Sequence, residues 1–100
     1  ILGEEEKPFW KDHKAAKINT MRHMTALKRA DIVVVRFGDK YRQWNAAFDA
    51  GIAIALGKSL IVEHAPELTH PLKEIDAAAH AVAENTDQVI EVLKYLCLDY

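Results

Sequence analysis

Two polar side chains lie one helical turn apart in a segment that is otherwise mostly apolar. The stretch QWNAAFDAGIAIALGK, residues 43–58, predicts a helix in which Asp49 follows Asn45 by four residues. Residues at this spacing share one side of a helix, so the two side chains would form a short polar stripe. A carboxylate at this position can serve ligand binding or catalysis. It can also simply favour the positive N-terminal end of its helix.

The strand expected before this helix brings Asp49 close to a place where ligands bind. ADIVVVRF, residues 30–37, carries an uninterrupted β-branched run, which is typical of a strand buried on both faces in a parallel sheet. In open α/β sheets, ligands bind in the crevice beyond the carboxyl ends of the strands. Because only the loop at residues 38–43 separates strand and helix, Asp49 is expected within about one turn of that crevice. Asp49 is therefore the candidate catalytic residue.

Further polar and aromatic residues follow the predicted strands at the same edge. Aromatic rings can stack on a base and polar groups can fix a sugar, so this mixture favours a nucleoside-like ligand. A solvated loop position is the alternative reading for each residue taken singly. The candidate ligand-binding residues are Arg36, Phe37, Tyr41, Trp44, Asn45, His64 and His70. Glu63, Thr69, Lys73 and Asp76 belong to the same polar group.

The five histidines do not form a recognisable metal site. His13 and His23 are about 15 Å apart along a helix, so they cannot share an ion. His64 and His70 could converge across a loop, but no cysteine or close pair of carboxylates completes a ligand set. The sequence also has no glycine-rich phosphate loop and no nucleophile elbow. We expect neither a metal nor a cofactor.

The composition narrows the class of protein. The 100 residues are 50% hydrophobic with a formal net charge of −2, which predicts one globular domain spanning residues 1–100. The basic residues are scattered along the chain, so neither nucleic acid nor a membrane surface is an expected partner. The longest apolar run, residues 51–56, is too short to cross a bilayer. Cys97 has no second cysteine to pair with and is expected to be buried and inert, which fits a cytoplasmic location.

Helix and strand signals alternate along the chain. Residues 12–29 predict a helix, and Gly57 is suited to close the helix that carries Asp49. SLIVEH, residues 59–64, predicts a second strand. The irregular apolar side of the first helix is formed by Ile18, Met21, Met24, Ala26 and Leu27.

The second half of the chain continues this alternation. Thr69 can cap a short helix that has Pro71 in its first turn. A third strand is expected at residues 81–84, and Asn85 and Gln88 suit the start of a final helix as a capping box. The residues that this helix is expected to turn toward the core are Val89, Ile90, Leu93, Leu96 and Cys97.

The alternation predicts an α/β layered domain with a parallel sheet. Three strands make a thin sheet, and an unpaired strand edge readily pairs with another chain. We therefore expect one edge of the sheet to need a partner, and a homodimer to form.

Several long segments resemble the YtoQ family. They are ILGEEEKPFWKDHKAAKIN, ADIVVVRFGDKYRQWNAAFDAG, ALGKSLIV and ELTHPLKEIDAAAHAVAE, and they cover nearly the whole chain. The resemblance implies that this chain lacks the N-terminal part of the family domain, where a first strand, a helix and a second strand would lie.

AFDAGIAIALGKSLIV is also similar, more distantly, to nucleoside 2-deoxyribosyltransferases. Those enzymes commonly read Glu-Leu-Gly where this chain has Asp49, Ala50 and Gly51, and their glutamate attacks the anomeric carbon of the sugar and displaces the base. The resemblance implies a flavodoxin-like three-layer fold. It also implies that Asp49 is the nucleophile of a transferase or hydrolase acting on the N-glycosidic bond of a nucleoside or nucleotide. Two alternatives stay open: a non-catalytic module that binds a nucleotide-like ligand, and a homo-oligomeric assembly protein.

Overall fold

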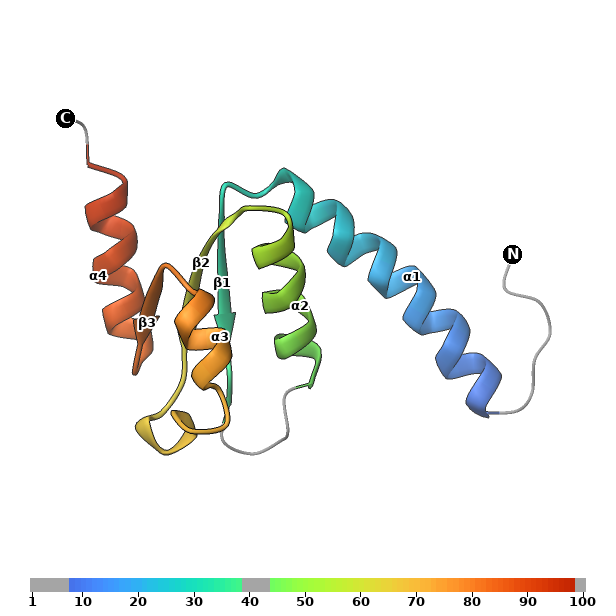
Figure 1. The fold of residues 1–100 in the computed structure, drawn as a ribbon. Coiled ribbons are helices and arrows are strands. Elements are labelled where there is room, and N and C mark those ends of the chain that lie inside the picture. Colours follow the sequence, from blue (N-terminus) through green and yellow to red (C-terminus); the bar gives the residue numbers. More distant parts are fainter. Residues whose placement is uncertain (1–7, 39–43, 99–100) are drawn as a thin grey trace.

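Helices and strands alternate along the chain in the order that the sequence predicts. The computed structural model describes residues 8–38 and 44–98, with side chains described from residue 13 onward. The elements in the described part are α1 (Pro8–Arg29), β1 (Ile32–Arg36), α2 (Trp44–Ala55), β2 (Ser59–Glu63), the 3-10 helix η1 (Pro66–Leu68), α3 (Lys73–Ala78), β3 (Ala81–Ala83) and α4 (Thr86–Leu96) (Figure 1).

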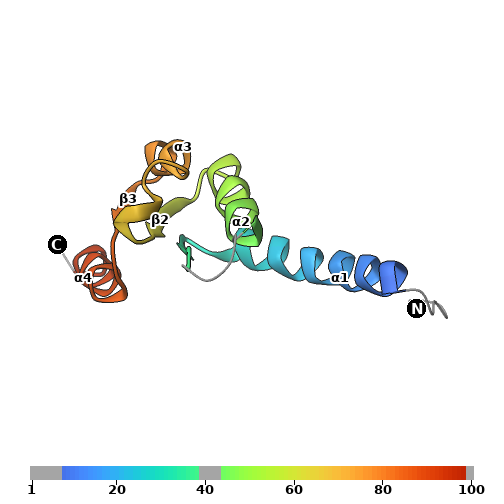
Figure 2. The ribbon, with the colours of Figure 1, turned by 90° about the horizontal axis from the view of Figure 1, so that it is seen from below.

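The three strands form one parallel sheet in the order β1-β2-β3. Val34 of β1 is paired with Ile61 of β2, and Ile61 is paired with Ala81 of β3. Helices α2 and α3 cover one face of the sheet, and α4 covers part of the other (Figure 2). The prediction of an α/β domain with a parallel sheet is confirmed, and this layered arrangement is consistent with a flavodoxin-like fold.

The core lies on both sides of the central strand β2, because successive side chains of a strand point to opposite faces. Leu60 and Val62 pack beneath α2, whereas Ile61 packs beneath α4, and all three are fully buried. Two small residues of α2, Ala50 and Ala53, are also fully buried, so this helix lies close against the sheet.

Gly57 ends α2 as the sequence predicts. Its φ of 73° is the left-handed conformation that glycine adopts at little cost. The Gly57 N–H donates to the Ile54 carbonyl at 3.1 Å, and the Lys58 N–H donates to the Ala53 carbonyl at 3.0 Å. This pair of bonds is the Schellman motif, which satisfies carbonyls that the end of the helix would otherwise leave free.

The predicted capping box at the start of α4 is confirmed as well. The Gln88 N–H donates to Asn85 Oδ1 at 2.9 Å, and Gln88 Oε1 accepts from the Glu84 N–H at 2.7 Å. The returning bond reaches one residue further back than in the usual capping box. These bonds orient α4 directly after the short strand β3.

The first strand is buried on one face only, so the prediction of burial on both faces is wrong. Val33 and Val35 are buried under α2, whereas Val34, on the opposite face, is 43% exposed. The physical reason is that α4 packs on β2 and β3 and does not reach over β1. The face of β1 that carries Val34 is therefore not covered by any helix in the described part of the chain.

The final helix buries a narrower stripe than predicted. Val89 is buried and Leu93 is half-buried, as expected. Ile90, Leu96 and Cys97 are exposed, so their predicted core positions are wrong, and Cys97 is an exposed free cysteine and not a buried one. A helix that rests on two strands of a thin sheet is covered along one side only.

The helix predicted to start at Thr69 begins later. The Thr69 hydroxyl donates to the Pro66 carbonyl at 2.7 Å and so closes η1. Helix α3 begins at Lys73, after a turn that includes Pro71, and Leu72 at its start contributes no side-chain cap. The predicted capping role of Thr69 and the predicted place of Pro71 in the first helical turn are therefore wrong.

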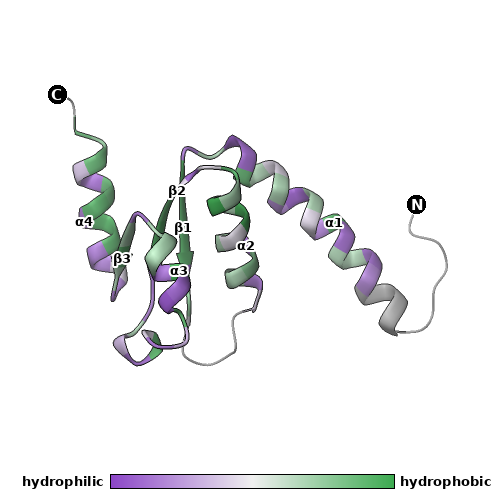
Figure 3. Cartoon of the chain, in the orientation of Figure 1, coloured by the Kyte–Doolittle hydropathy of each residue, from purple (hydrophilic) through white to green (hydrophobic). Residues whose placement is uncertain are grey.

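Helix α1 starts earlier than predicted and projects from the rest of the molecule (Figure 2). Of its apolar side, Leu27 is buried, whereas Ile18 and Met21 are exposed. Hydrophilic and hydrophobic residues alternate along its surface, in contrast to the predominantly hydrophobic α2 (Figure 3). Among the described residues, no helix has the length and apolar character required to cross a membrane.

Candidate functional site

Asp49 lies on the side of α2 that turns away from the sheet and toward α1. Its neighbour Ala50 is completely buried in the core, while the Asp49 side chain keeps 29% of its surface exposed. Oδ1 of Asp49 is nevertheless buried and has no hydrogen-bond partner. Most buried polar atoms in folded proteins are hydrogen-bonded, so an unpaired carboxylate oxygen calls for an explanation.

A hollow of about 180 Å³ opens beside this carboxylate, between α1 and α2. We call it the α1–α2 hollow. This volume is smaller than the ~300 Å³ at the lower end of ligand pockets, so the hollow suits a group of about the size of a single sugar and not a whole nucleoside. The residues that line it are Ala16, Asn19, Thr20 and His23 of α1 and Asn45, Phe48 and Asp49 of α2.

His23 is the nearest charged or titratable neighbour that the structure records for Asp49. Its Nδ1 lies 3.6 Å from Asp49 Oδ1, and its side chain is 55% exposed. This separation exceeds the range of a hydrogen bond but is within the range of an ion pair when the imidazole is protonated. The pair joins α1 to α2 beside the hollow, which both residues line.

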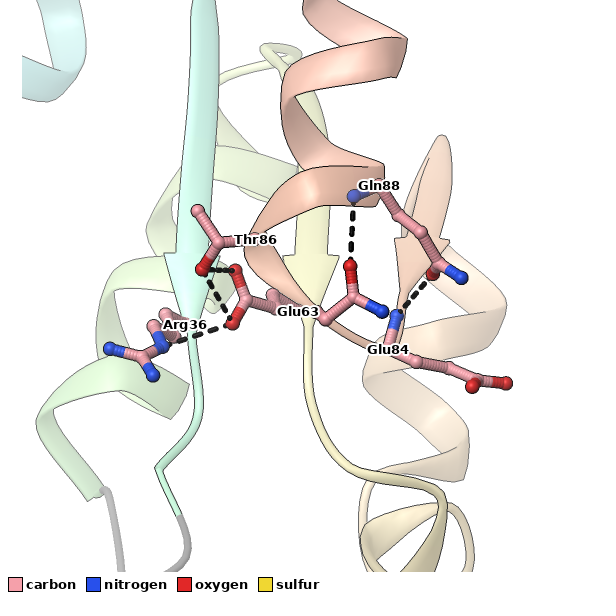
Figure 4. A network of polar contacts seen from close by, with 6 residues as sticks. Arg36, Glu63, Glu84, Thr86 and Gln88 are labelled. Carbon is pink, nitrogen blue, oxygen red and sulfur yellow. Dashed lines mark hydrogen bonds and ion pairs between the residues drawn. The ribbon is translucent and has the colours of Figure 1, made fainter.

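A second polar cluster lies at the carboxyl ends of the strands, where the sequence places the ligand crevice. Glu63 ends β2 and is only 7% exposed. Arg36 Nε donates to Glu63 Oε2 at 2.9 Å, and the Thr86 hydroxyl lies 3.1 Å from Oε1 and 3.3 Å from Oε2 (Figure 4). We call Arg36, Glu63 and Thr86 the carboxyl-edge network. Both oxygens of its carboxylate have partners.

The network and the hollow lie on opposite sides of the sheet. Arg36 and Val34 leave β1 on the face that α4 partly covers, because they alternate with the buried Val33 and Val35. Asp49 belongs to α2, which covers the other face. The structure therefore places Arg36 and Asp49, both predicted site residues, in different surroundings.

His64 is buried in a third polar group, next to the start of η1. Its Nδ1 lies 2.7 Å from the Ala65 carbonyl oxygen, and its Nε2 lies 2.7 Å from Asp76 Oδ2. Burial by itself lowers the pKa of His64, but the Ala65 carbonyl, the Asp76 carboxylate and the charge of Glu84 together raise the pKa above its ordinary 6.5. An acceptor lies at each ring nitrogen, and only the protonated imidazole can donate to both.

The remaining predicted site residues are dispersed. Phe37 is buried in the core, while Trp44 and His70 are exposed. Tyr41 lies outside the described residues. Of the predicted residues, the structure brings Asp49 and Asn45 together in one hollow, and it does not bring Arg36, His64 or His70 to them.

Sequence reasoning missed the residues that α1 contributes. Asn19, Thr20 and His23 line the hollow together with Ala16, at the spacing that places residues on one side of a helix. This polar row could have been found by asking which side of the first helix avoids apolar residues. Its contact with Asp49 could not, because that depends on how α1 packs against α2.

The described residues contain no group of three or more histidine, cysteine, aspartate or glutamate side chains that could hold a metal ion. The chemistry available at the α1–α2 hollow is thus that of one carboxylate, one imidazole and uncharged amide and hydroxyl groups.

The fold and this site define an α/β protein that presents a partly desolvated carboxylate in a sugar-sized hollow. Residues 1–97 match the model of the family described as nucleoside 2-deoxyribosyltransferase YtoQ, and the chain belongs to this family. It is also similar to the protein named "Uncharacterized protein YtoQ" of Bacillus subtilis (strain 168), with 44% identity over 96 residues. The match covers 96% of this chain and 65% of that relative's length.

Proposed function

We propose that this protein transfers or hydrolyses the N-glycosidic bond of nucleosides or nucleotides, with Asp49 as the nucleophile. The observation that carries the proposal is that Asp49 lines the α1–α2 hollow with part of its side chain exposed, while one of its carboxylate oxygens, Oδ1, is buried without a hydrogen-bond partner. Because 29% of the Asp49 side chain remains exposed, a ligand in the hollow can meet the carboxylate. The description of the family as nucleoside 2-deoxyribosyltransferases supports the same chemistry.

The reaction would proceed in two displacements. An Asp49 oxygen attacks the anomeric carbon of the sugar, the carbon–nitrogen bond breaks, and its electron pair leaves with the base. The resulting sugar ester of Asp49 is then opened by a water molecule or by a second base, which restores the carboxylate. The net product is a free sugar in the first case and an exchanged nucleoside in the second.

The residues around Asp49 suit a sugar with a base attached. The amide groups of Asn19 and Asn45 and the hydroxyl of Thr20 can bond sugar hydroxyls or orient Asp49. The hollow is too small for a whole nucleoside, so the base would extend from it. The exposed ring of Phe48 lines the hollow and can stack on that base.

The test is an assay of the full chain with a panel of purine and pyrimidine nucleosides, 2′-deoxynucleosides and their monophosphates. We expect base release or base exchange with at least one of them, and loss of this activity in Asp49→Asn. Asp31→Asn is the matched control, because Asp31 is exposed and does not line the hollow. Intact-mass measurement should also detect a sugar adduct on the wild type that is absent from Asp49→Asn.

No base release from any member of the panel would refute the proposed function. Saturable binding of one of these compounds without turnover, little changed by Asp49→Asn, would identify a binding module in place of an enzyme.

For the location of the protein, we propose the cytoplasm, because an exposed single thiol is best preserved in a reducing compartment.

A homodimer is proposed on separate grounds. β1 is an edge strand of the described sheet, and Val34 at its centre is 43% exposed. Exposed strand edges pair readily with another chain, and pairing of two β1 strands about a two-fold axis would bring the Val34 side chains of both copies together on one face of the joined sheet. Sedimentation at micromolar concentration should show a dimer that Val34→Lys dissociates. Val82→Lys, at the other edge strand and with a similar exposure of 47%, is the control that should remain dimeric. A wild-type monomer would refute the dimer.

A further inference from the structure

We infer that His23 is the general acid and base of the α1–α2 hollow, so that it protonates the departing base and later deprotonates the water or base that replaces it. This inference rests on the proposed function and extends it to a residue on a different helix. It is carried by the position of His23, which lines the same hollow as Asp49 and has its Nδ1 3.6 Å from Asp49 Oδ1.

The chemistry requires such a group. When the carbon–nitrogen bond breaks, the electron pair goes to a ring nitrogen of the base, and a proton supplied there avoids release of an unstable anion. In the first displacement, a proton moves from His23 to that nitrogen while Asp49 bonds to carbon. In the second displacement, neutral His23 takes a proton from the attacking water or base while the ester bond to Asp49 breaks. Protons and electrons therefore balance over one turnover.

The other lining groups leave this role to His23. Asn19, Thr20 and Asn45 carry amide and hydroxyl groups, which do not ionise near neutral pH. Ala16 and Phe48 have no polar side-chain atom. Besides Asp49 itself, His23 is thus the one titratable residue among those that line the hollow.

Distance and exposure both suit the role. Hydrogen bonds of catalytic groups are often long before the substrate binds, so a separation of 3.6 Å from Asp49 is compatible with a working pair. Retaining glycosidases hold their acid and nucleophile about 5–5.5 Å apart, and the second nitrogen of the imidazole extends the reach of His23 beyond Nδ1. The His23 side chain is 55% exposed, so the imidazole is open to approach by a substrate.

The alternative role is structural, in which His23 only ties α1 to α2 through its charge. The two roles differ in how a variant responds to the leaving group. A general acid matters when the leaving group is a poor one and matters little when it departs readily as an anion. A residue that only fixes the position of α1 should affect both kinds of substrate alike.

The experiment compares His23→Ala with the wild type on two substrates, a 2′-deoxynucleoside that the wild type cleaves and p-nitrophenyl 2-deoxyriboside, whose leaving group needs no proton. We expect a loss of about 100-fold or more on the nucleoside and only a few-fold on the nitrophenyl compound. Added imidazole should restore part of the activity on the nucleoside. Arg22→Ala, an exposed neighbour on α1 that does not line the hollow, should leave both rates unchanged.

Equal losses on the two substrates, with no rescue by imidazole, would overturn the role of His23 and leave the proposed function intact. Absence of base release by the wild type would overturn both. Circular dichroism and thermal unfolding of His23→Ala show whether the fold is kept, and His23→Gln, which retains more of the side-chain volume, gives the same comparison if the alanine variant unfolds.

Discussion

Two carboxylates on opposite sides of the sheet are largely removed from water, and they differ in what surrounds them. Both oxygens of Glu63 have partners, in Arg36 and Thr86. Asp49 Oδ1 has no hydrogen-bond partner, and the His23 imidazole lies 3.6 Å from it. A satisfied buried carboxylate stabilises the structure that holds it, whereas an unsatisfied one costs free energy in the absence of a ligand.

The difference follows from where each side chain is attached. Glu63 ends the central strand, and backbone pairing with both neighbouring strands fixes its position relative to Arg36 of β1 and to the start of α4. Asp49 points toward a helix that projects from the body of the molecule (Figure 1). The sheet thus binds its carboxylate internally, whereas the proposed function assigns the carboxylate of the hollow to a ligand.

The largest expected effect that tests this contrast comes from Asp49→Asn. Turnover should fall by about 10⁴-fold or more, because a nucleophile is lost. The free energy of unfolding should stay the same or rise by about 1 kcal/mol, because the buried Oδ1 has no hydrogen-bond partner and loses its share of the negative charge. Urea unfolding, together with the base-release assay, measures both quantities. A variant that loses activity and stability together would show that Asp49 is structural and would end the contrast with Glu63.

The second largest effect is expected at the buried pair of His64 and Asp76. His64→Leu should lower the free energy of unfolding by about 3 kcal/mol, because the Asp76 carboxylate is left without its charged partner. The double variant His64→Leu with Asp76→Leu should recover part of that loss, and this comparison by urea unfolding is the check. A single variant as stable as the wild type would mean that the pair contributes nothing.

A smaller effect is expected within the carboxyl-edge network. Glu63→Gln should lower the free energy of unfolding by about 1–2 kcal/mol, since its hydrogen bonds lose their charge. The exposed side chain of Arg36 limits the contribution of that ion pair. Thr86→Val removes one donor to the same carboxylate and should cost less. If either variant abolished base release without changing stability, the network and not the hollow would be the site of the chemistry.

The smallest expected effect is the pH dependence of stability that His64 introduces. Because folding raises the pKa of His64 above 6.5, its stabilising contribution is complete below pH 6.5 and is lost as the pH rises through the pKa of the folded state. Deprotonation costs less than His64→Leu, since the bond to the Ala65 carbonyl can remain. Unfolding measured across this pH range should show a decrease in stability that His64→Leu lacks. An identical pH profile in the two proteins would contradict this.

The features that sequence predicted correctly depend on residues close together in the chain. Gly57 closes α2 and Asn85 caps α4 through bonds that span only a few residues, so local composition was sufficient. The errors at Val34, Ile90 and Cys97 have a different origin. Periodicity shows which side of an element is apolar, but how much of that side is covered depends on the neighbours that pack on it.

The candidate site also has one part that local sequence predicts and one part that depends on how the helices pack. The stripe of Asn45 and Asp49 was predictable, because both residues lie on one helix. The approach of His23 to Asp49 depends on the angle between α1 and α2, and no local pattern encodes that angle. The predicted grouping of Asp49 with Arg36 did not allow for the two faces of the sheet, which separate residues that are near in the chain.

Helix α1 is attached near one end, so a small change in its angle moves its other end by a large distance. It is fastened at its C-terminal end, where Leu27 is buried and the Lys58 ammonium donates to the Lys28 carbonyl at 2.9 Å. Ala16, at the far end of the hollow, lies about 16 Å from Leu27 along the helix axis. A rotation of about 10° around that anchorage would therefore move Ala16 by about 3 Å while hardly displacing Leu27. The width of the α1–α2 hollow therefore depends strongly on the angle between α1 and α2.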